Sequence, residues 1–168
     1  MSTIETTREI IPAGSWAVDP VHTTIGFQVT DTADLVSTIN GRFTEFEGRL
    51  EGGEQPSLAG TIRAGSVRTD NEQRDAHLAS ADFLDAEHYP EISFASTAVE
   101  PLDDERFRLR GELRVKDAPF EVELAGRIRG RGRGKAGDER LVLDVNGGFE
   151  WGTTTVELTA AVSATRGA

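Results

Sequence analysis

Three histidines, His22, His77 and His88, are the side chains in this sequence best suited to proton transfer or metal binding near neutral pH. They lie far apart in the chain and form no HxH or HExxH pattern. The chain also has no cysteine that could complete a ligand set or form a disulfide. We therefore predict no metal site and no cofactor.

Nucleophilic catalysis finds equally little support. The sequence has no GxSxG motif and no phosphate-binding loop of the P-loop type. Asp82 and Asp85 flank an apolar pair, but this spacing is more typical of turns and helix caps than of an acid–base pair. We predict that the protein is not an enzyme, and an enzyme that uses His22 or His77 as a base is the weakest hypothesis.

The elements that position these residues are mostly strands. Apolar residues alternate with polar ones over long stretches, which is typical of strands with one dry and one wet face. Short turn sequences separate the stretches and favour antiparallel neighbours. Seven or eight such strands in one domain leave a sandwich or a closed barrel, and alternation alone does not separate the two. The clearest stretches cover residues 25–29, 107–115, 120–124, 141–147 and 156–162.

One segment departs from this pattern. Residues Asn71 to Leu84 are rich in helix formers, and Asn71 or Asp70 is a plausible N-cap, so we predict a short helix or helical turn over the barrel. Tyr89-Pro90 should end it and begin a strand over residues 92–99.

Length and charge limit the possible functions. The 168 residues suit one domain, and we predict a flexible tail over residues 1–14 followed by the domain over 15–168. The net charge of -11 argues against nucleic acid as a partner. No run approaches the roughly 20 apolar residues of a membrane helix, and the first residues do not resemble a secretory signal. We therefore expect no integral membrane segment and a cytoplasmic protein.

A local basic run interrupts the acidic composition. Arg131 and Arg133 alternate with glycines after Arg127 and Arg129. A flexible, solvated loop over residues 130–138 is the simpler interpretation, and contact with an anion or a lipid headgroup is the alternative.

Four segments carry a family likeness. They are WAVDPVHTTIGF at 16–27, NGRFTEFEG at 40–48, SVRTDNEQRDAHLASADFLD at 66–85 with YPEISF at 89–94, and ELRVKDAPFEV at 112–122. Together they resemble the YceI-like family over roughly residues 15 to 165. Two departures stand out: Asp117-Ala118 replaces a longer turn before Pro119, and residues 143–151 run almost directly into the last strand.

The resemblance implies an all-β fold, a single antiparallel lipocalin-like barrel of about eight strands with one short helix. It implies an interior that takes a polyisoprenoid, an isoprenoid quinone or a related lipid, often in a homodimer, and no reaction. His22 and His77 fall in family-like segments, so they are candidates for the polar mouth of the pocket.

The candidate ligand wall consists of large inward residues, although each could equally be plain core in a barrel filled by its own side chains. Small inward residues such as Gly60, Ala64 and Gly111 would leave room along the axis. The candidates are Ile25, Phe27, Phe43, Phe46, Ile62, Phe83, Ile92, Phe94, Phe107, Leu109, Leu113, Phe120, Val122, Leu124, Leu141, Leu143, Phe149 and Trp151.

Two functional hypotheses thus lead. The first is a non-catalytic carrier or store for a long apolar ligand. The second is a ligand-free barrel that binds a protein partner through its rim or through the arginine–glycine segment.

Overall fold

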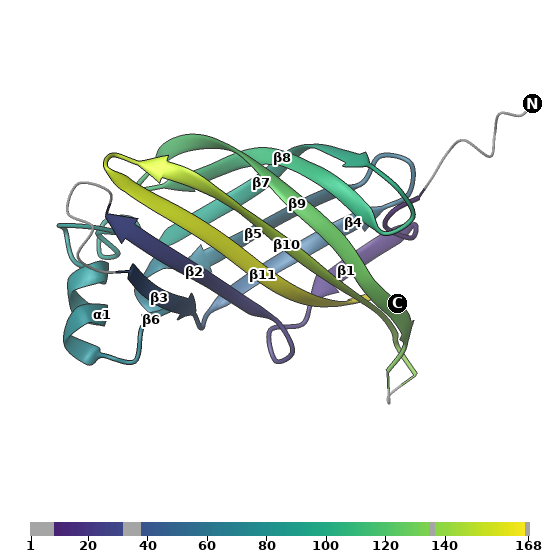
Figure 1. Cartoon of the computed structure of the whole chain (residues 1–168). Coiled ribbons are helices and arrows are strands. Elements are labelled where there is room, and N and C mark those ends of the chain that lie inside the picture. Colours follow the sequence, from purple (N-terminus) through teal and green to yellow (C-terminus); the bar gives the residue numbers. More distant parts are fainter. Residues whose placement is uncertain (1–8, 32–37, 135–136, 167–168) are drawn as a thin grey trace, which may run out of the picture.

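The computed structural model describes residues 9–31, 38–134 and 137–166, in which eleven strands and one α-helix form a barrel (Figure 1). Alternating apolar residues form these strands because each strand turns one face to the interior and the other to solvent. The strands are β1 (Gly14–Val18), β2 (Thr24–Asp31), β3 (Thr38–Phe43), β4 (Phe46–Gly52), β5 (Ser57–Arg63), β6 (Val67–Arg68), β7 (Glu91–Pro101), β8 (Arg106–Val115), β9 (Ala118–Arg133), β10 (Glu139–Trp151) and β11 (Thr154–Arg166), and the helix is α1 (Glu72–Ala79).

The barrel closes with antiparallel pairing throughout. β11 pairs with β2 along one half and with β1 along the other, so β1 and β2 occupy one position of the wall. β3 and β4 share the next position, and β5 and β6 share the third. With β7 to β11 the wall has eight positions, which confirms the predicted all-β, lipocalin-like barrel.

Tight turns join the long strands. β8 and β9 are connected through Lys116 and Asp117, whose φ angles of 54° and 61° form a two-residue hairpin turn of the kind that matches strand twist. Gly152, with φ of 65°, serves the turn between β10 and β11. These two turns lie at the same end of the barrel as α1 (Figure 1).

A packed plug fills the opposite end. Trp16 and Phe107 are each 1 % exposed there, and they pack with inward residues of β4, β5, β10 and β11. Ile10 and Ile11 also belong to this plug, at 4 % and 0 % exposure. The folded domain therefore begins before residue 15, where we had expected the tail to end, and residues 1–8 lie outside the described part.

Several inward glycines are covered by aromatic rings. A Cβ on Gly41 would lie 2.4 Å from the ring of Phe27, and one on Gly111 would lie 2.5 Å from the ring of Phe94. Gly111 was expected to leave room along the axis, but the neighbouring phenyl ring takes that space. Gly60 lines the cavity, but a Cβ there would lie 2.9 Å from the backbone carbonyl oxygen of Glu47, so close backbone approach also requires a glycine at this position.

The helix begins where the sequence placed it and ends earlier. The Asn71 side chain accepts a hydrogen bond from the Arg74 N–H at 3.0 Å, which confirms the predicted N-cap. The helix ends at Ala79 rather than Leu84, because Ser80 turns back and its N–H and hydroxyl both donate to the carbonyl of His77. Turns then lead to β7, which spans Glu91–Pro101.

The arginine–glycine segment is a strand for most of its length. β9 continues to Arg133, and Gly132 pairs with Arg140 of β10. The expected loop over residues 130–138 is therefore wrong up to residue 133, because alternating glycine and arginine can continue the ladder of β10.

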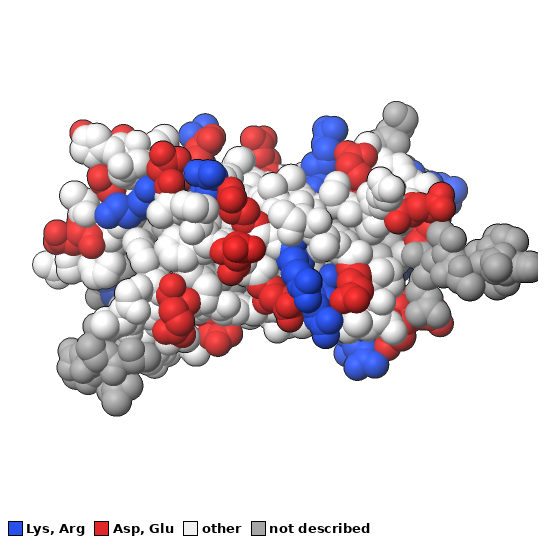
Figure 2. All heavy atoms as spheres, turned by 90° about the horizontal axis from the view of Figure 1, so that it is seen from above, with Lys and Arg blue, Asp and Glu red and all other residues white. Residues whose placement is uncertain are grey.

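On the face seen in Figure 2, charged side chains of both signs are scattered among uncharged residues. Many are cross-strand pairs, such as Arg108 with Glu100 at 3.0 Å and Arg129 with Asp144 at 2.6 Å. The large apolar residues lie mostly in the interior. No helix among the described residues is long and apolar enough to cross a membrane.

Candidate functional site

The barrel contains a cavity of about 760 Å³ between the plug and the end next to α1. This volume lies in the range of about 300–1,000 Å³ typical of small-molecule sites. Lys116, Gly152 and Phe83 line it at the α1 end, from the β8–β9 turn, the β10–β11 turn and the segment after α1. That end is the mouth, since the plug fills the other.

Most of the predicted wall residues surround this cavity. They come from seven of the eight wall positions and from the segment after α1, so residues far apart in the sequence meet around one space. The predicted residues on the wall are Ile25, Phe27, Phe43, Phe46, Ile62, Phe83, Ile92, Phe94, Leu109, Leu113, Leu124, Phe149 and Trp151.

Five other candidates lie elsewhere. Phe107, Leu141 and Leu143 belong to the plug beneath the cavity, at 1 %, 0 % and 0 % exposure. Val122 and Phe120 pack in the apolar cluster around the mouth half of the barrel. All five face inward, but they do not reach the cavity surface.

The wall also includes apolar residues that we had not put forward. The strand containing Val156, Leu158 and Ala160 contributes a continuous stripe, and its period-two pattern already marked these positions as one face. The further additions are Val18, Val29, Ile39, Leu50, Leu58, Val67, Leu78, Leu84, Val115, Val145 and Val162.

The mouth carries a few polar groups. Lys116 lies on the cavity surface and makes no hydrogen bond or ion pair with the residues that the structure describes, while its neighbour Asp117 pairs with Arg114 at 3.6 Å. Asp82 also lies on the surface and is 3.4 Å from His77 Nε2. His77 packs edge-on against Phe83 at 5.0 Å, so it stands beside the mouth without lining the wall.

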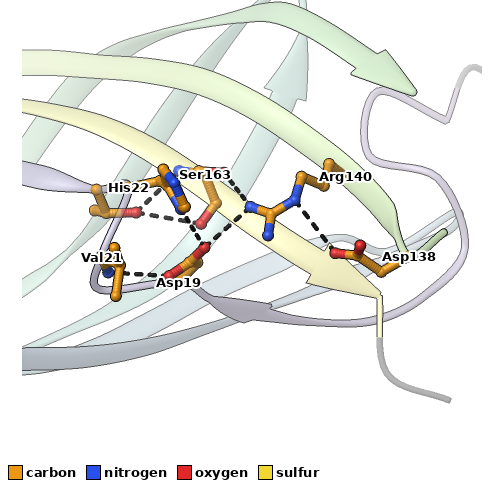
Figure 3. Close-up of polar contacts among 7 residues, drawn as sticks. Asp19, Val21, His22, Asp138, Arg140 and Ser163 are labelled. Atoms are coloured by element: carbon orange, nitrogen blue, oxygen red, sulfur yellow. Dashed lines mark hydrogen bonds and ion pairs between the residues drawn. The ribbon is translucent and has the colours of Figure 1, made fainter. Parts of the chain in front are cut away.

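His22 lies away from the mouth, on the outside of the barrel, although the sequence suggested a place near the pocket entrance. Its Nδ1 is 2.7 Å from Asp19 Oδ2, which also accepts a hydrogen bond from Arg140 at 3.0 Å (Figure 3). The hydrogen bonds from His22 and Arg140 hold the pKa of Asp19 well below its usual range. Arg140 also donates to Ser163 Oγ, so the cluster fastens the β1–β2 turn to β10 and β11.

His88 is an exposed turn residue. Its hydrogen bond to Asp85 and the charge of that carboxylate raise its pKa. Within the described ranges no group of three or more histidine or acidic side chains is placed to hold a metal ion. His22 and His88 thus each pair with a nearby carboxylate, Asp19 and Asp85, outside the lining of the apolar cavity.

Known proteins share this sequence pattern and this fold. The family model described as a YceI-like domain matches residues 16–163. A UPF0312 protein of Pseudomonas putida is 32 % identical over 126 residues, which cover 73 % of this chain and 62 % of that protein. Protein YceI of Escherichia coli O157:H7 is 30 % identical over 130 residues, 75 % of this chain and 66 % of that protein. The chain thus spans just over three fifths of the length of the Pseudomonas relative.

Solved structures agree on the fold. A YceI protein of Campylobacter jejuni superposes with a TM-score of 0.71 at 25 % identity, covering 79 % of this chain and 88 % of that one. BcnA of Burkholderia cenocepacia gives a TM-score of 0.76 at 17 % identity, with 88 % and 99 % covered. A polyisoprenoid binding domain from Saccharophagus degradans gives 0.70 at 10 % identity, with 90 % and 98 % covered.

Proposed function

Because this chain belongs to the YceI-like domain family, we propose that its cavity binds one long apolar ligand, a polyisoprenoid, an isoprenoid quinone or a related lipid. The protein would store or carry this ligand without changing it chemically. The cavity of about 760 Å³, with a wall of aliphatic and aromatic side chains, is the observation that supports the proposal.

The size of the cavity suits a chain of moderate length. A non-hydrogen atom takes about 30 Å³ at liquid density, so about 760 Å³ holds roughly 25 carbon atoms, or about five isoprene units. Burial of each methylene-sized group contributes about 0.8 kcal/mol, or about 3–4 kcal/mol gross for each five-carbon unit. Three or four buried units would exceed the roughly 8 kcal/mol of micromolar binding even after substantial ordering costs.

The ligand class also agrees with a structural relative. The domain from Saccharophagus degradans is described as polyisoprenoid binding, and its barrel covers 90 % of this chain. At 10 % identity the two proteins share the fold only, so we argue the ligand class from the apolar wall of this cavity and not from shared residues.

The polar mouth would orient the ligand. Lys116 is a cation on the cavity surface with no acidic partner among the described residues, and it lies where the end of an inserted chain would emerge. We propose that this end of the ligand is polar and that an anionic end, such as a phosphate or carboxylate, is preferred.

Native mass spectrometry of protein freshly purified from its own host, followed by organic extraction, is the direct test. We expect an added mass of several hundred daltons, on the scale of about 25 carbon atoms, that is released as an isoprenoid or another lipid. A mass equal to the bare chain, with no uptake of added polyprenol or quinone, would contradict the proposal and favour a barrel that binds a protein partner instead. The cytoplasmic location and the homodimer stay predictions, which cell fractionation and sedimentation test.

A further inference from the structure

A second, smaller pocket of about 310 Å³ lies at the plugged end of the barrel, where β9 and β11 end beside the beginnings of β10 and β1. Its lining is strongly basic for a chain with a net charge of -11. The side chains that define it are Trp16, Arg131, Arg133, Glu139, Arg140 and Arg166.

A β-bulge brings two of these arginines onto the inward face. The register between β9 and β10 shifts between Val142 and Leu143, so that Leu143 pairs with Ile128 but Leu141 pairs with Arg131. A shift of one residue reverses the side on which every following side chain points. Arg131 and Arg133 therefore face the side of Leu141, at the rim beyond the plug, whereas Arg129 points outward. Bulges often redirect side chains toward functional sites.

The redirected arginines have no acidic partner among the described residues, unlike their neighbours on the same strand. Arg127 pairs with Glu105 at 3.6 Å and Arg129 with Asp144 at 2.6 Å. Arg131 forms no hydrogen bond or ion pair with any residue in the described ranges, and Arg133 donates only to the carbonyl of Gly137. Two guanidinium groups thus border the pocket without an ion pair among the described residues, and the carboxylate in its lining, Glu139, pairs with Arg166 instead.

The other cations of the pocket are held in place. Arg166 lies over the Trp16 ring at 4.7 Å and pairs with Glu139 at 3.2 Å. Its Nε is nevertheless a buried donor with no acceptor among the described residues. Arg140 is held by Asp19 and Ser163 on one side and by Asp138, 3.2 Å from its Nε, on the other (Figure 3). Fixed and free guanidinium groups around one cavity provide several N–H donors that match the geometry of an oxyanion.

We propose that this pocket binds a small oxyanion, a phosphate or carboxylate group on a ligand of limited size. At about 30 Å³ for each non-hydrogen atom, 310 Å³ accommodates roughly ten atoms, the size of a small organic phosphate or polycarboxylate. The plug of Trp16, Phe107 and Leu141 separates this pocket from the lipid cavity. Anion binding here is therefore independent of the proposed lipid function.

The two tryptophans allow the pockets to be observed separately. Trp16 borders the anion pocket and its indole N–H donates to the Pro12 carbonyl at 2.8 Å, whereas Trp151 lines the lipid cavity near the mouth. We would follow both indole N–H signals by ¹H–¹⁵N NMR while adding inorganic phosphate, glycerol 3-phosphate or citrate at constant ionic strength. We expect at least one of the three to shift the Trp16 signal saturably, without moving that of Trp151. The three probes separate free phosphate from organic phosphates and from carboxylates.

Two double variants test whether the inward arginines bind the anion. Arg131→Gln with Arg133→Gln should weaken binding about tenfold or more, which is about 1.4 kcal/mol. Arg127→Gln with Arg129→Gln removes the same charge from the outward face of the same strand and should leave binding unchanged. If the first pair disturbs folding, Arg131→Gln alone serves, because Arg131 makes no hydrogen bond or ion pair with the described residues. Equal weakening by both pairs, or no saturable shift of Trp16 with any probe, would overturn the proposal.

Discussion

Replacing Ala160 with phenylalanine should shorten the ligand that the barrel can hold. Ala160 faces the cavity from β11, where it pairs with Ile25 on one side and Val145 on the other. The substitution adds six carbon atoms to a space for roughly 25, which is about the volume of one isoprene unit. The neighbouring Ala161 points to solvent, so Ala161→Phe is a matched control on the same strand.

The expected loss follows from the contacts of one isoprene unit. These contribute about 3–4 kcal/mol gross, and if about half of that remains after the ordering costs of binding, the variant loses about 2 kcal/mol. That corresponds to about 30-fold weaker binding of a five-unit chain. Shorter chains, which do not need the volume taken by the added ring, should bind as tightly as in the wild type.

A length series of prenols provides the measurement. Titrations followed through Trp151 fluorescence should show affinity rising with length to about five units in the wild type and to about four units in Ala160→Phe. The unfolding midpoint is a second readout, because a ring placed in an empty cavity should not lower stability, whereas overpacking a filled core costs about 1–3 kcal/mol. Equal losses in Ala160→Phe and Ala161→Phe, or an unchanged length limit, would refute a hollow binding site.

Three further results are expected. Phe107→Ala should lower the free energy of unfolding by about 3–5 kcal/mol in urea titrations, because the ring is 1 % exposed and fills the space above Gly126, and a loss under about 1 kcal/mol would contradict its place in the plug. Hydrogen bonds from the Arg106 backbone N–H and guanidinium lower the pKa of Asp103 to about 2. The stabilisation by this carboxylate is therefore present above its unfolded pKa near 3.9 and is lost as the pH falls through about 2. The difference in unfolding free energy between wild type and Asp103→Asn should shrink across that pH range, and a constant difference would count against the reasoning. Lys116→Gln should reduce binding of a prenyl phosphate more than binding of the matching prenol, measured by competition, and equal effects on both would remove the anionic end from the proposal.

The sequence predicts the wall of the barrel well because strand alternation is a local property. Which side chains share the inward face follows from period two alone, and the cap at Asn71 follows from a hydrogen bond within one turn. The short turn after Lys116 was also evident, because Asp117-Ala118 replaces a longer turn of the YceI-like family before Pro119. Each of these features depends on neighbours a few residues away.

Alternation does not give the height of a residue along the barrel axis, and that height separates wall from plug. Phe94 and Phe107 both face inward, yet one lines the cavity and the other lies beneath it. The boundary depends on Ile10 and Ile11, which reach the core from a segment that reads as a polar tail. A long-range contact of this kind leaves no periodic signal in the sequence.

The same limitation applies to the arginines at the plugged end, whose facing we did not predict. Residues 127 to 133 continue one alternation without interruption in the sequence, so alternation alone places all the arginines on one face. The bulge opposite Val142 and Leu143 divides them, because it inserts one residue and reverses the facing of everything after it. The inward face is hydrocarbon from the mouth to the plug and cationic beyond it. The same barrel wall thus lines an apolar cavity at one end and a basic pocket at the other, and substitutions can address each pocket separately.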